Sequence, residues 1–477
     1  MELPTMAWGF LAPLGLALAL AALAPAELLA ASKARPCATT EVAASVDAKA
    51  AKGADRLSIV LVGDTGFNPT EAKVDPAGVV LKGGEVMSFA DTITGVAREV
   101  DGDLAFVNLE TVVTDRNDIR TDSNKSRGSF HFRSHPLGVK ALQDAGFNLF
   151  ALANNHSMDY GAAGVEETLY HMAVAGAERG IAFAGIGANF DEATRPACIE
   201  LDGTRIGFGA IGIVTGDIPQ HRAGPKKPGQ ASYRNRLDFE TVVDRLASMQ
   251  ADYRILSIHY GLEGRVVPDD RQFTDWRAFA AEQKGIDLIA GHHPHVAQAV
   301  ELNGKSLIFY GLGNFMHPGT AEMTHFGICR DYGLMAKVHL ARDGAGYRVG
   351  AIEAIPLTKT NERPERFTPE EATTRIYALN HLAGDLDDGK NAKGVRFTPQ
   401  PDGSGLYCAQ GAAELGGKLG KLCEGWQQAS APPEPLAAEI AEACEDKPFY
   451  GKPALTKRRA QQPRRAASPP QPFGSFR

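Results

Sequence analysis

The sequence lacks the motifs of several common enzyme classes. It has no Gly-x-Ser-x-Gly segment, which excludes the nucleophile elbow of α/β-hydrolases, and no Gly-x-x-x-x-Gly-Lys segment, which excludes a phosphate-binding P-loop. The loop Gly185-Ile-Gly187 lacks the third glycine of a dinucleotide-binding fingerprint, so we interpret it as a turn. No internal repeat is evident. These absences leave metal-dependent chemistry as the class to examine.

An excess of positive charge is also missing. The 477 residues carry a formal net charge of −7, and 22% of them are charged, so the chain is mildly acidic. This disfavours nucleic acid as the main partner. An anionic substrate remains possible, because bound metal ions would supply positive charge locally. Arg133 either adds a cation near such a site or is an ordinary surface arginine.

Five short apolar runs each end in side chains that can bind a metal ion. Such runs are typical of buried strands in an α/β sheet, and ligands bind beyond the carboxyl ends of these strands. The residues concerned are Asp64 after 57–63, Asn108 and Glu110 after 104–107, Asn155 and His156 after 147–153, His259 after 254–258, and His292, His293 and His295 after 288–291. A single polar strand end is usually a turn residue or a helix cap, but five together predict one shared site.

The segment Gly291-His-His-Pro-His295 is the strongest of these signals. His293 and His295 are two residues apart, so on an extended backbone they would lie on the same side. Neutral imidazoles in that arrangement are good ligands for a first-row transition metal. No cysteine lies in the motif segments, so a zinc site with thiolate ligands is not expected. The mixed nitrogen and oxygen ligands favour Mn, Fe or Zn over Ca.

The order of these motifs resembles the CapA family of capsule-synthesis proteins, which belongs to the calcineurin-like metallophosphoesterase superfamily. The motifs are Gly63-Asp64, Asn108-Leu-Glu110, Asn154-Asn-His156, His259-x-Gly-x-Glu263 and Gly291-His-His-Pro-His295. The segments 130–133, 161–168, 185–189 and 310–315 are similar as well. The resemblance covers residues 57–357. It implies the α/β fold class and, within it, an α/β/β/α sandwich.

The resemblance also implies one or two divalent metal ions held between strand ends. Six residues are implied as ligands: Asp64 and His295 for one ion, Asn155, His259 and His293 for the other, and Glu110 as the bridging carboxylate. Two departures leave the number of ions open. Asp64-Thr-Gly66 lacks the histidine of the usual Asp-x-His opening, and Asn108-Leu-Glu110 replaces the usual bridging aspartate motif.

Two further residues are expected to act in catalysis. His156, which matches the superfamily's substrate-facing histidine, either donates a proton to the leaving group or hydrogen-bonds a substrate oxygen. Its structural alternative is a loop histidine bonded to a backbone carbonyl. Glu263 either orients His259 or a water molecule beside the metal, or is a solvated turn carboxylate. We interpret Asp159 as the cap of the following helix, with a contact to a site residue as the alternative, and Asn314 as a structural turn residue that could also reach the site.

The first 31 residues predict export. Residues 6–23 are almost wholly apolar, and Ala24-Pro-Ala26 offers small residues for cleavage, as in a secretory signal peptide. No Lys or Arg precedes the apolar run, and the run is nearly long enough to span a bilayer, so it is either cleaved or kept as an anchor. The expected location is periplasmic, extracellular or anchored on the outer side of the cytoplasmic membrane. Six cysteines then permit disulfides, and Cys408–Cys423 is the pair we expect first.

The rest of the chain divides into four parts. They are a linker at 32–56, the main domain at 57–357, a largely helical C-terminal extension at 358–450 and a basic, disordered tail at 451–477. Helices are expected at Pro136–Ala145 and Phe273–Lys284. Antiparallel strands are expected at Leu334–Leu340 and Tyr347–Ile352.

These features predict an exported, metal-dependent hydrolase of the CapA type. For that family the polymer handled is typically poly-γ-glutamate capsule, so the expected substrate is an anionic polymer or a phosphoester. Capsule-synthesis proteins are the expected partners. Paired divalent ions suit hydrolysis of either bond. The alternative is a non-catalytic polymer-binding or assembly component with a degenerate metal site, which the missing histidine at Gly66 supports.

Overall fold

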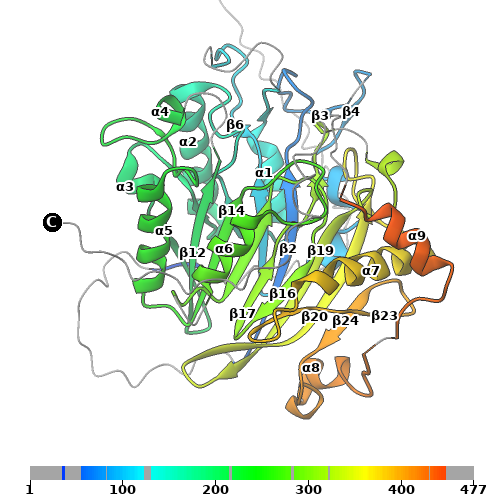
Figure 1. Ribbon diagram of the computed structural model, residues 1–477. Coiled ribbons are helices and arrows are strands. Elements are labelled where there is room, and N and C mark those ends of the chain that lie inside the picture. The colour runs from blue at the N-terminus through cyan, green and yellow to red at the C-terminus, as the bar shows by residue number, and fades with distance from the viewer. Residues whose placement is uncertain are drawn as a thin grey trace, which may run out of the picture. The chain divides into compact units, whose positions relative to one another are not determined.

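A computed structural model places strands and helices in one compact unit, Ser32–Arg477, and confirms the α/β class (Figure 1). The residues it describes are 35–37, 55–81, 83–122, 130–213, 218–280, 284–320, 323–428 and 430–446. The expected signal or anchor, most of the expected linker and the basic tail lie outside these residues. No helix among the described residues is long and apolar enough to cross a membrane.

One sheet is built around β2 and contains the first three strand ends of interest. Its described strands run in the order β23, β24, β20, β19, β2, β5, β8 and β9, while β18 pairs with β2 and β21 with β20. Their bounds are β2 Arg56–Thr65, β5 Leu104–Leu109, β8 Leu149–Ala151, β9 Ala182–Ala184, β18 Asn314–Met316, β19 Gly333–Asp343, β20 Gly346–Thr358, β21 Glu365–Arg366, β23 Thr398–Pro399 and β24 Gly405–Cys408. Because β2, β5 and β8 are parallel neighbours, their carboxyl ends lie at the same edge.

A second sheet is built around β14 and contains the other two strand ends. Its described strands run in the order β1, β11, β12, β14, β15, β17, β16 and β22. Their bounds are β1 Arg35–Pro36, β11 Ala197–Leu201, β12 Thr204–Gly212, β14 Tyr253–His259, β15 Leu288–His292, β16 Val300–Asn303, β17 Ser306–Phe309 and β22 Ala392–Gly394. β14 and β15 are parallel, and His259 is in register with His292. The five apolar runs are therefore divided between two sheets.

The two sheets pack face to face through an apolar layer. Alternate residues of β2 point to opposite sides, as the pleat of a strand requires. Ile59 and Leu61 are buried in the same cluster as Phe208 of the second sheet. Val60 and Val62 belong to a separate cluster on the outer side of the β2 sheet. Burying one such side chain contributes about 1.5–3 kcal/mol, so this layer fixes the sheets against each other.

Helices cover the outer faces of both sheets (Figure 1). α1 and α2 pack on the β2 sheet through Leu142 and Val165, and α5 and α6 pack on the β14 sheet through Val242 and Trp276. The helix bounds are α1 Pro136–Asp144, α2 Gly161–Arg179, α3 Phe190–Ala193, α4 Ile218–His221, α5 Arg236–Ser248, α6 Asp270–Phe279, α7 Pro369–Ala383, α8 Gly417–Leu422 and α9 Leu436–Ala443. Short strands outside the two sheets are β3 Val79–Val80, β4 Val86–Met87, β6 Val112–Val113, β7 Arg133–Ser134, β10 Ile186–Gly187 and β13 Gly229–Gln230.

The predicted elements agree with the structure except in two places. α1 and the antiparallel pair β19 and β20 confirm the predictions. The helix expected at Phe273–Lys284 was wrong in its bounds, because α6 begins earlier, at a capping box formed by Asp269 and Gln272, and ends at Phe279. The segment Gly185–Gly187 is not simply a turn, since β10 within it pairs with β13.

The C-terminal extension contains strands as well as helices and joins both sheets. β24 and β23 extend the β2 sheet beyond β20, and β22 extends the β14 sheet beyond β16. α7 packs on the interior through Ile376 and Leu379. Residues after 357 therefore complete the same compact unit.

Disulfides fasten both ends of the described chain. Cys408–Cys423 is the predicted local bridge and is confirmed. Cys329–Cys444 ties the end of α9 to the loop before β19. Cys37–Cys198, together with the pairing of β1 and β11, attaches part of the expected linker to the β14 sheet. All six cysteines are thus in disulfides.

Candidate metal centre

The carboxyl ends of β2, β5, β14 and β15 bring the expected ligands together. Two groups made up of these expected ligands have potential ligand atoms within 4.8 Å of one another: Asp64, Glu110 and His259, and Glu110, His293 and His295. Glu110 belongs to both groups. Asn155 adjoins them, since its Oδ1 lies 2.5 Å from Nε2 of His259. The structure therefore places all six expected ligands in one cluster, contributed by both sheets.

The two groups do not pair the residues as the resemblance implied. Asp64 is grouped with His259 rather than with His295. Its Oδ2 nevertheless lies 3.2 Å from Nδ1 of His295, while its Oδ1 is 3.8 Å from Nδ1 of His259. Asp64 thus lies between His259 and His295 and could share a metal ion with either imidazole.

The backbone of the histidine pair differs from the extended conformation that we expected. β15 ends at His292, and φ is +90° at His293 and +59° at His295. Residues other than glycine rarely adopt this left-handed backbone conformation, and each one that does so costs about 1–3 kcal/mol of folding free energy. The backbone N–H of His293 donates to Oδ2 of Asp64 at 3.1 Å, which helps to hold the loop. His293 and His295 are thus both in a strained backbone conformation.

Asp64 is fully buried among donors. Its Oδ1 accepts a hydrogen bond from Asn108 Nδ2 at 2.8 Å and lies 3.2 Å from Nδ1 of His292. Burial alone would raise the pKa of Asp64, but the adjacent rings of His292 and His295 outweigh burial and hold that pKa well below its usual value. Burial also acts on His295, where the charges of Glu110 and Asp64 outweigh it and raise the pKa to about 10. Asp64 is therefore ionised, as an oxygen ligand of a cation would be.

Glu110 and the neighbouring imidazoles fit a divalent cation. Among the described residues, neither carboxylate oxygen of Glu110 has a hydrogen-bond partner, and burial together with Asp64 raises its pKa well above the usual value. Burial lowers the pKa of His259 well below its usual value and that of His293 to about 4, so both rings are neutral, as metal-binding imidazoles must be. A buried carboxylate without a partner is costly, and a cation between these atoms would satisfy it.

His156 lies at the edge of this cluster, oriented by a carboxylate. Its Nδ1 is 2.8 Å from Oδ2 of Asp159, and its Nε2 is 3.8 Å from Oε1 of Glu110. The helix-cap role expected of Asp159 was wrong, because Tyr160 is the N-cap residue of α2 and no side chain caps that end. Asp159 instead accepts from Phe132 N–H and from the imidazole, and the Phe132 ring packs 4.3 Å from that of His156.

Glu263 lies on the loop after β14 and is exposed. Its charge raises the pKa values of His293 and His295, although burial is the larger influence on each. Nδ1 of His259 lies 3.1 Å from Nδ2 of Asn108, so Asn108 can orient this ring, a role that we considered for Glu263. Glu263 therefore faces the cluster from the solvent side.

Sequence reasoning missed or misjudged several residues in contact with the cluster. Asn314, expected to be a structural turn residue, reaches the site, since its Oδ1 is 2.9 Å from Nδ1 of His295. Asn108 and His292 lie within the quoted motifs but were not among the six expected ligands. His317, three residues after Asn314, lies in no segment whose pattern indicated a metal ligand. The contacts of these residues depend on which strands pair, and the spacing of residues along the sequence does not determine that pairing.

Arg133 is neither a surface residue nor a described contact of the cluster. It is buried, its guanidinium donates to the carbonyls of Ala72 and Arg116, and it lies over the ring of Tyr160 at 5.1 Å. These contacts give it a structural role in joining loops.

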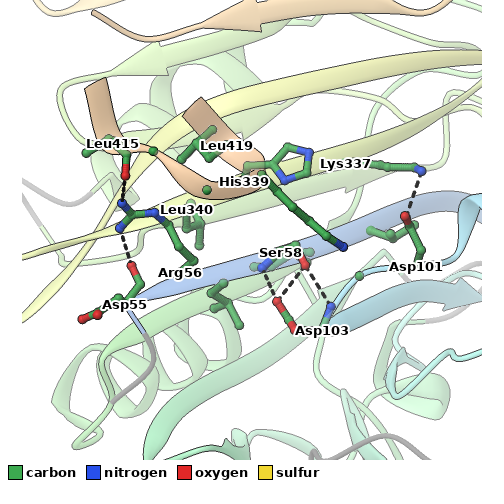
Figure 2. Close-up of a pocket in the computed structure, with 17 residues that line it drawn as sticks. Asp55, Arg56, Ser58, Asp101, Asp103, Lys337, His339, Leu340, Leu415 and Leu419 are labelled. Atoms are coloured by element: carbon green, nitrogen blue, oxygen red, sulfur yellow. Dashed lines mark hydrogen bonds and ion pairs between the residues drawn. The ribbon is translucent and has the colours of Figure 1, made fainter. Parts of the chain in front are cut away.

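A separate cavity of about 430 Å³ opens at the other end of β2 (Figure 2). Its lining includes residues 55–60 and 415–419 but none of the expected site residues. Ser58 is six residues before Asp64, which is about 20 Å along a strand. Among the side chains drawn there, Lys337 is paired with Asp101 and Asp103 with Ser58. This cavity is distinct from the metal cluster.

The family model of the bacterial capsule synthesis protein PGA_cap matches residues 58–318, more than half of the chain. The chain belongs to this family. The match includes every expected ligand and both expected catalytic residues, from Asp64 to His295. The resemblance to the CapA family that the motifs predicted is therefore confirmed.

Relatives in the PGA_cap family carry names that refer to capsule or polymer synthesis. The chain is 27% identical over 259 residues to the capsule biosynthesis protein CapA of Bacillus anthracis, covering 53% of this chain and 58% of that relative. It is 30% identical over 309 residues to a probable polyglutamine synthesis accessory protein of Mycobacterium tuberculosis, covering 63% and 76% of the two chains. The chain thus spans less than two thirds of the Bacillus relative.

Among solved structures, the chain is similar to the sulfate thiohydrolase SoxB of Thermus thermophilus in complex with glycerol. The TM-score is 0.35 at 13% identity, with 69% of this chain and 61% of SoxB covered.

Proposed function

We propose that this chain is an exported, metal-dependent hydrolase that acts on a capsular polymer, with poly-γ-glutamate or a related anionic polymer as substrate. The observation that carries the proposal is the pair of ligand groups that share Glu110. A carboxylate between two sets of ligands is suited to hold a divalent ion on each side. The nitrogen and oxygen donors favour Mn, Fe or Zn.

The ligands are assigned to two ions as the superfamily resemblance implies. Asp64 and His295 would hold one ion, Asn155, His259 and His293 the other, and Glu110 both. The close approaches of Asp64 Oδ2 to His295 Nδ1 and of Asn155 Oδ1 to His259 Nε2 support this assignment. When bound, such ions supply Lewis acidity and stabilise the negative charge that develops as a phosphoester or amide bond is hydrolysed.

His156 is the proposed proton donor. Asp159 fixes Nδ1, which leaves Nε2 directed at the cluster. A histidine held in this way donates a proton to a leaving group or hydrogen-bonds a substrate oxygen. Glu263, on the exposed loop beside His293 and His295, is proposed to orient a water molecule at the solvent side of the site.

The polymer and the partners are inferred from the relatives. Family members are named for capsule and poly-γ-glutamate biosynthesis, so we assign this chain the handling of such a polymer. Capsule-synthesis proteins are the proposed partners. The phosphoester is the competing substrate, since the same chemistry hydrolyses both bonds.

The proposed location is outside the cytoplasmic membrane. All six cysteines form disulfides, which persist in oxidising compartments and are rare in the cytosol. Two of the bridges join residues more than 100 positions apart, so the fold depends on them. Together with the apolar segment near the start of the chain, this supports a periplasmic, extracellular or membrane-anchored protein.

The test measures metal and turnover on the same preparation. Disulfide-bonded protein is assayed for bound metal and for hydrolysis of an aryl phosphate and of poly-γ-glutamate, with and without added Mn²⁺. We expect His293→Ala to lose both metal and activity. The matched control is His339→Ala, because His339 lies on β19 with Nε2 2.7 Å from Glu353, outside the cluster. That control should retain both.

The outcomes separate hydrolase from binding component. Metal-dependent turnover that His293→Ala abolishes supports the proposal. Stoichiometric metal without turnover of either substrate contradicts the hydrolase and favours a polymer-binding or assembly component. Failure to bind metal at all rejects the metal centre itself.

A further inference from the structure

A histidine outside the expected ligand set lies beside Glu110. His317 directly follows β18, in which Asn314 pairs with Asp64, and its backbone N–H donates to the Thr360 carbonyl at 2.7 Å. The side chain is fully buried, and its Nε2 is 3.6 Å from Oε2 of Glu110. The pairing of β18 with β2 thus brings this imidazole to the metal cluster from a distant part of the chain.

Both ring nitrogens of His317 lack a hydrogen-bond partner among the described residues. Leaving a buried polar group unsatisfied costs about 1–3 kcal/mol, so an imidazole in this state needs an explanation. The 3.6 Å separation from Glu110 is too long for a good hydrogen bond. It is shorter than two metal–ligand bonds of about 2.1 Å each, so one cation could contact both atoms.

The ring of His317 is held in this position by its packing. A Cβ atom on Gly66 would lie 3.5 Å from Cε1 and 3.6 Å from Nε2 of His317, so the ring packs directly on the glycine. Phe132 contacts it edge-on with ring centroids 5.0 Å apart, and the ring of His295 is 6.0 Å away. Gly66 is two residues after Asp64, so the absence of a side chain there makes room for the imidazole.

We propose that His317 is an additional metal ligand on the Asp64 and His295 side of the cluster. It supplies, from β18, the imidazole that the segment Asp64-Thr-Gly66 lacks. This inference rests on the proposed metal-dependent function and adds a ligand to it. With His317 included, the departure at Gly66 no longer implies a degenerate site.

The test compares metal binding in four variants. His317→Ala removes the proposed ligand, His317→Leu replaces it with a side chain that cannot bind metal but fills space, and His293→Ala removes an expected ligand. The matched control is His131→Ala, because His131 is also buried without a hydrogen-bond partner for its ring and lies 3.5 Å from Glu71, not from Glu110. Metal content, Mn²⁺ affinity by calorimetry and the visible spectrum with Co²⁺ are measured.

We expect both His317 variants to bind one ion at least about 100-fold more weakly and to alter the Co²⁺ spectrum, since even an outer contact of a ligand changes affinity about 10- to 100-fold. His131→Ala should match the unmodified chain. A direct reading comes from ¹⁵N-histidine NMR of the unmodified chain during Zn²⁺ titration, which does not depend on the folding of any variant. The Nε2 resonance of His317 should shift with the first equivalents of metal.

The results distinguish this inference from the proposed function. If His293→Ala loses metal while both His317 variants keep full affinity, an unchanged Co²⁺ spectrum and an unshifted Nε2, then His317 is not a ligand, although the metal centre stands. If the unmodified chain binds no divalent ion, both proposals fail. Weakened binding in both His317 variants as well as in His293→Ala, with His131→Ala unaffected, supports the ligand.

Discussion

The disulfide Cys329–Cys444 should stabilise the protein more than Cys408–Cys423, and removing each in turn tests the reasoning. The two bridges close loops of very different length, with sequence separations of 115 and 15 residues. A cross-link restricts the unfolded chain more when its loop is longer. All four cysteines are at most 5% exposed, so replacing either pair by alanine leaves similar small cavities.

The expected magnitudes follow from loop-closure entropy. A loop of 115 residues corresponds to about 5 kcal/mol of stabilisation, and one of 15 residues to about 3 kcal/mol. Cys329→Ala/Cys444→Ala should therefore lower the free energy of unfolding by about 2 kcal/mol more than Cys408→Ala/Cys423→Ala. Urea-induced unfolding of the two double variants and the unmodified chain measures this difference. Equal losses, or a larger loss in the short-loop variant, would refute the entropic reasoning.

The long-loop bridge also supports the loop beside the metal cluster. Arg330, next to Cys329, donates to the carbonyls of Gly264, Ala443 and Glu445, and Arg265 is ion-paired with Asp446. The C-terminal segment is thereby fastened to the loop that follows β14. Amide hydrogen exchange at residues 261–267 should be faster in the Cys329/Cys444 variant than in the Cys408/Cys423 variant. Unchanged exchange would show that the side-chain contacts alone hold this loop.

Three other substitutions have defined outcomes. Asn108→Ala removes a 2.8 Å hydrogen bond to buried Asp64. The free energy of unfolding should therefore fall by about 1.5–3 kcal/mol, measured by urea unfolding, and the metal affinity should fall about 10- to 100-fold, measured by calorimetry. An unchanged affinity would contradict this expectation. Asp159→Asn removes the carboxylate that orients His156, so turnover should fall at least about 100-fold while the metal content stays intact. Full turnover would exclude the orienting role of Asp159. Burial raises the pKa of Asp287 from 3.8 to about 6, so its protonated form stabilises the fold below pH 3.8 and this contribution is lost as pH rises through about 6. The free energy of unfolding of Asp287→Asn, relative to that of the unmodified chain, should therefore rise by up to about 3 kcal/mol between pH 4 and pH 7. Urea unfolding at both pH values measures this difference, and a difference that does not depend on pH would contradict the expectation.

The strand-end residues could be predicted because they follow apolar runs directly. Asp64, Asn155 and His259 are each at or just beyond the end of a buried strand, and parallel pairing within each sheet brings such ends together. The sequence pattern does not encode that two sheets, rather than one, supply the ligands. That property depends on which strands pair, and so on contacts between distant segments.

Residues whose role depends on backbone conformation or long-range pairing were mispredicted or missed. Asp159 is placed equally well for capping a helix and for contacting His156, and the backbone at Tyr160 decides between these roles. His317 reaches the cluster only because β18 pairs with β2. No local spacing connects residue 317 with residue 110.

The division of the ligands between two sheets has a consequence for how the site keeps its shape. Asp64 and Glu110 lie at or just beyond the ends of strands of one sheet, whereas His259 and His293 lie at or just beyond the ends of strands of the other. Their separation is therefore set by the apolar layer between the sheets, in which Phe106 contacts both Phe208 and the ring of His292. A rigid interior of this kind can hold the strained backbone at the histidine loop, because relaxing the loop would require the ladder at the end of β15 to shift. The geometry of the candidate metal site is thus a property of the whole two-sheet core.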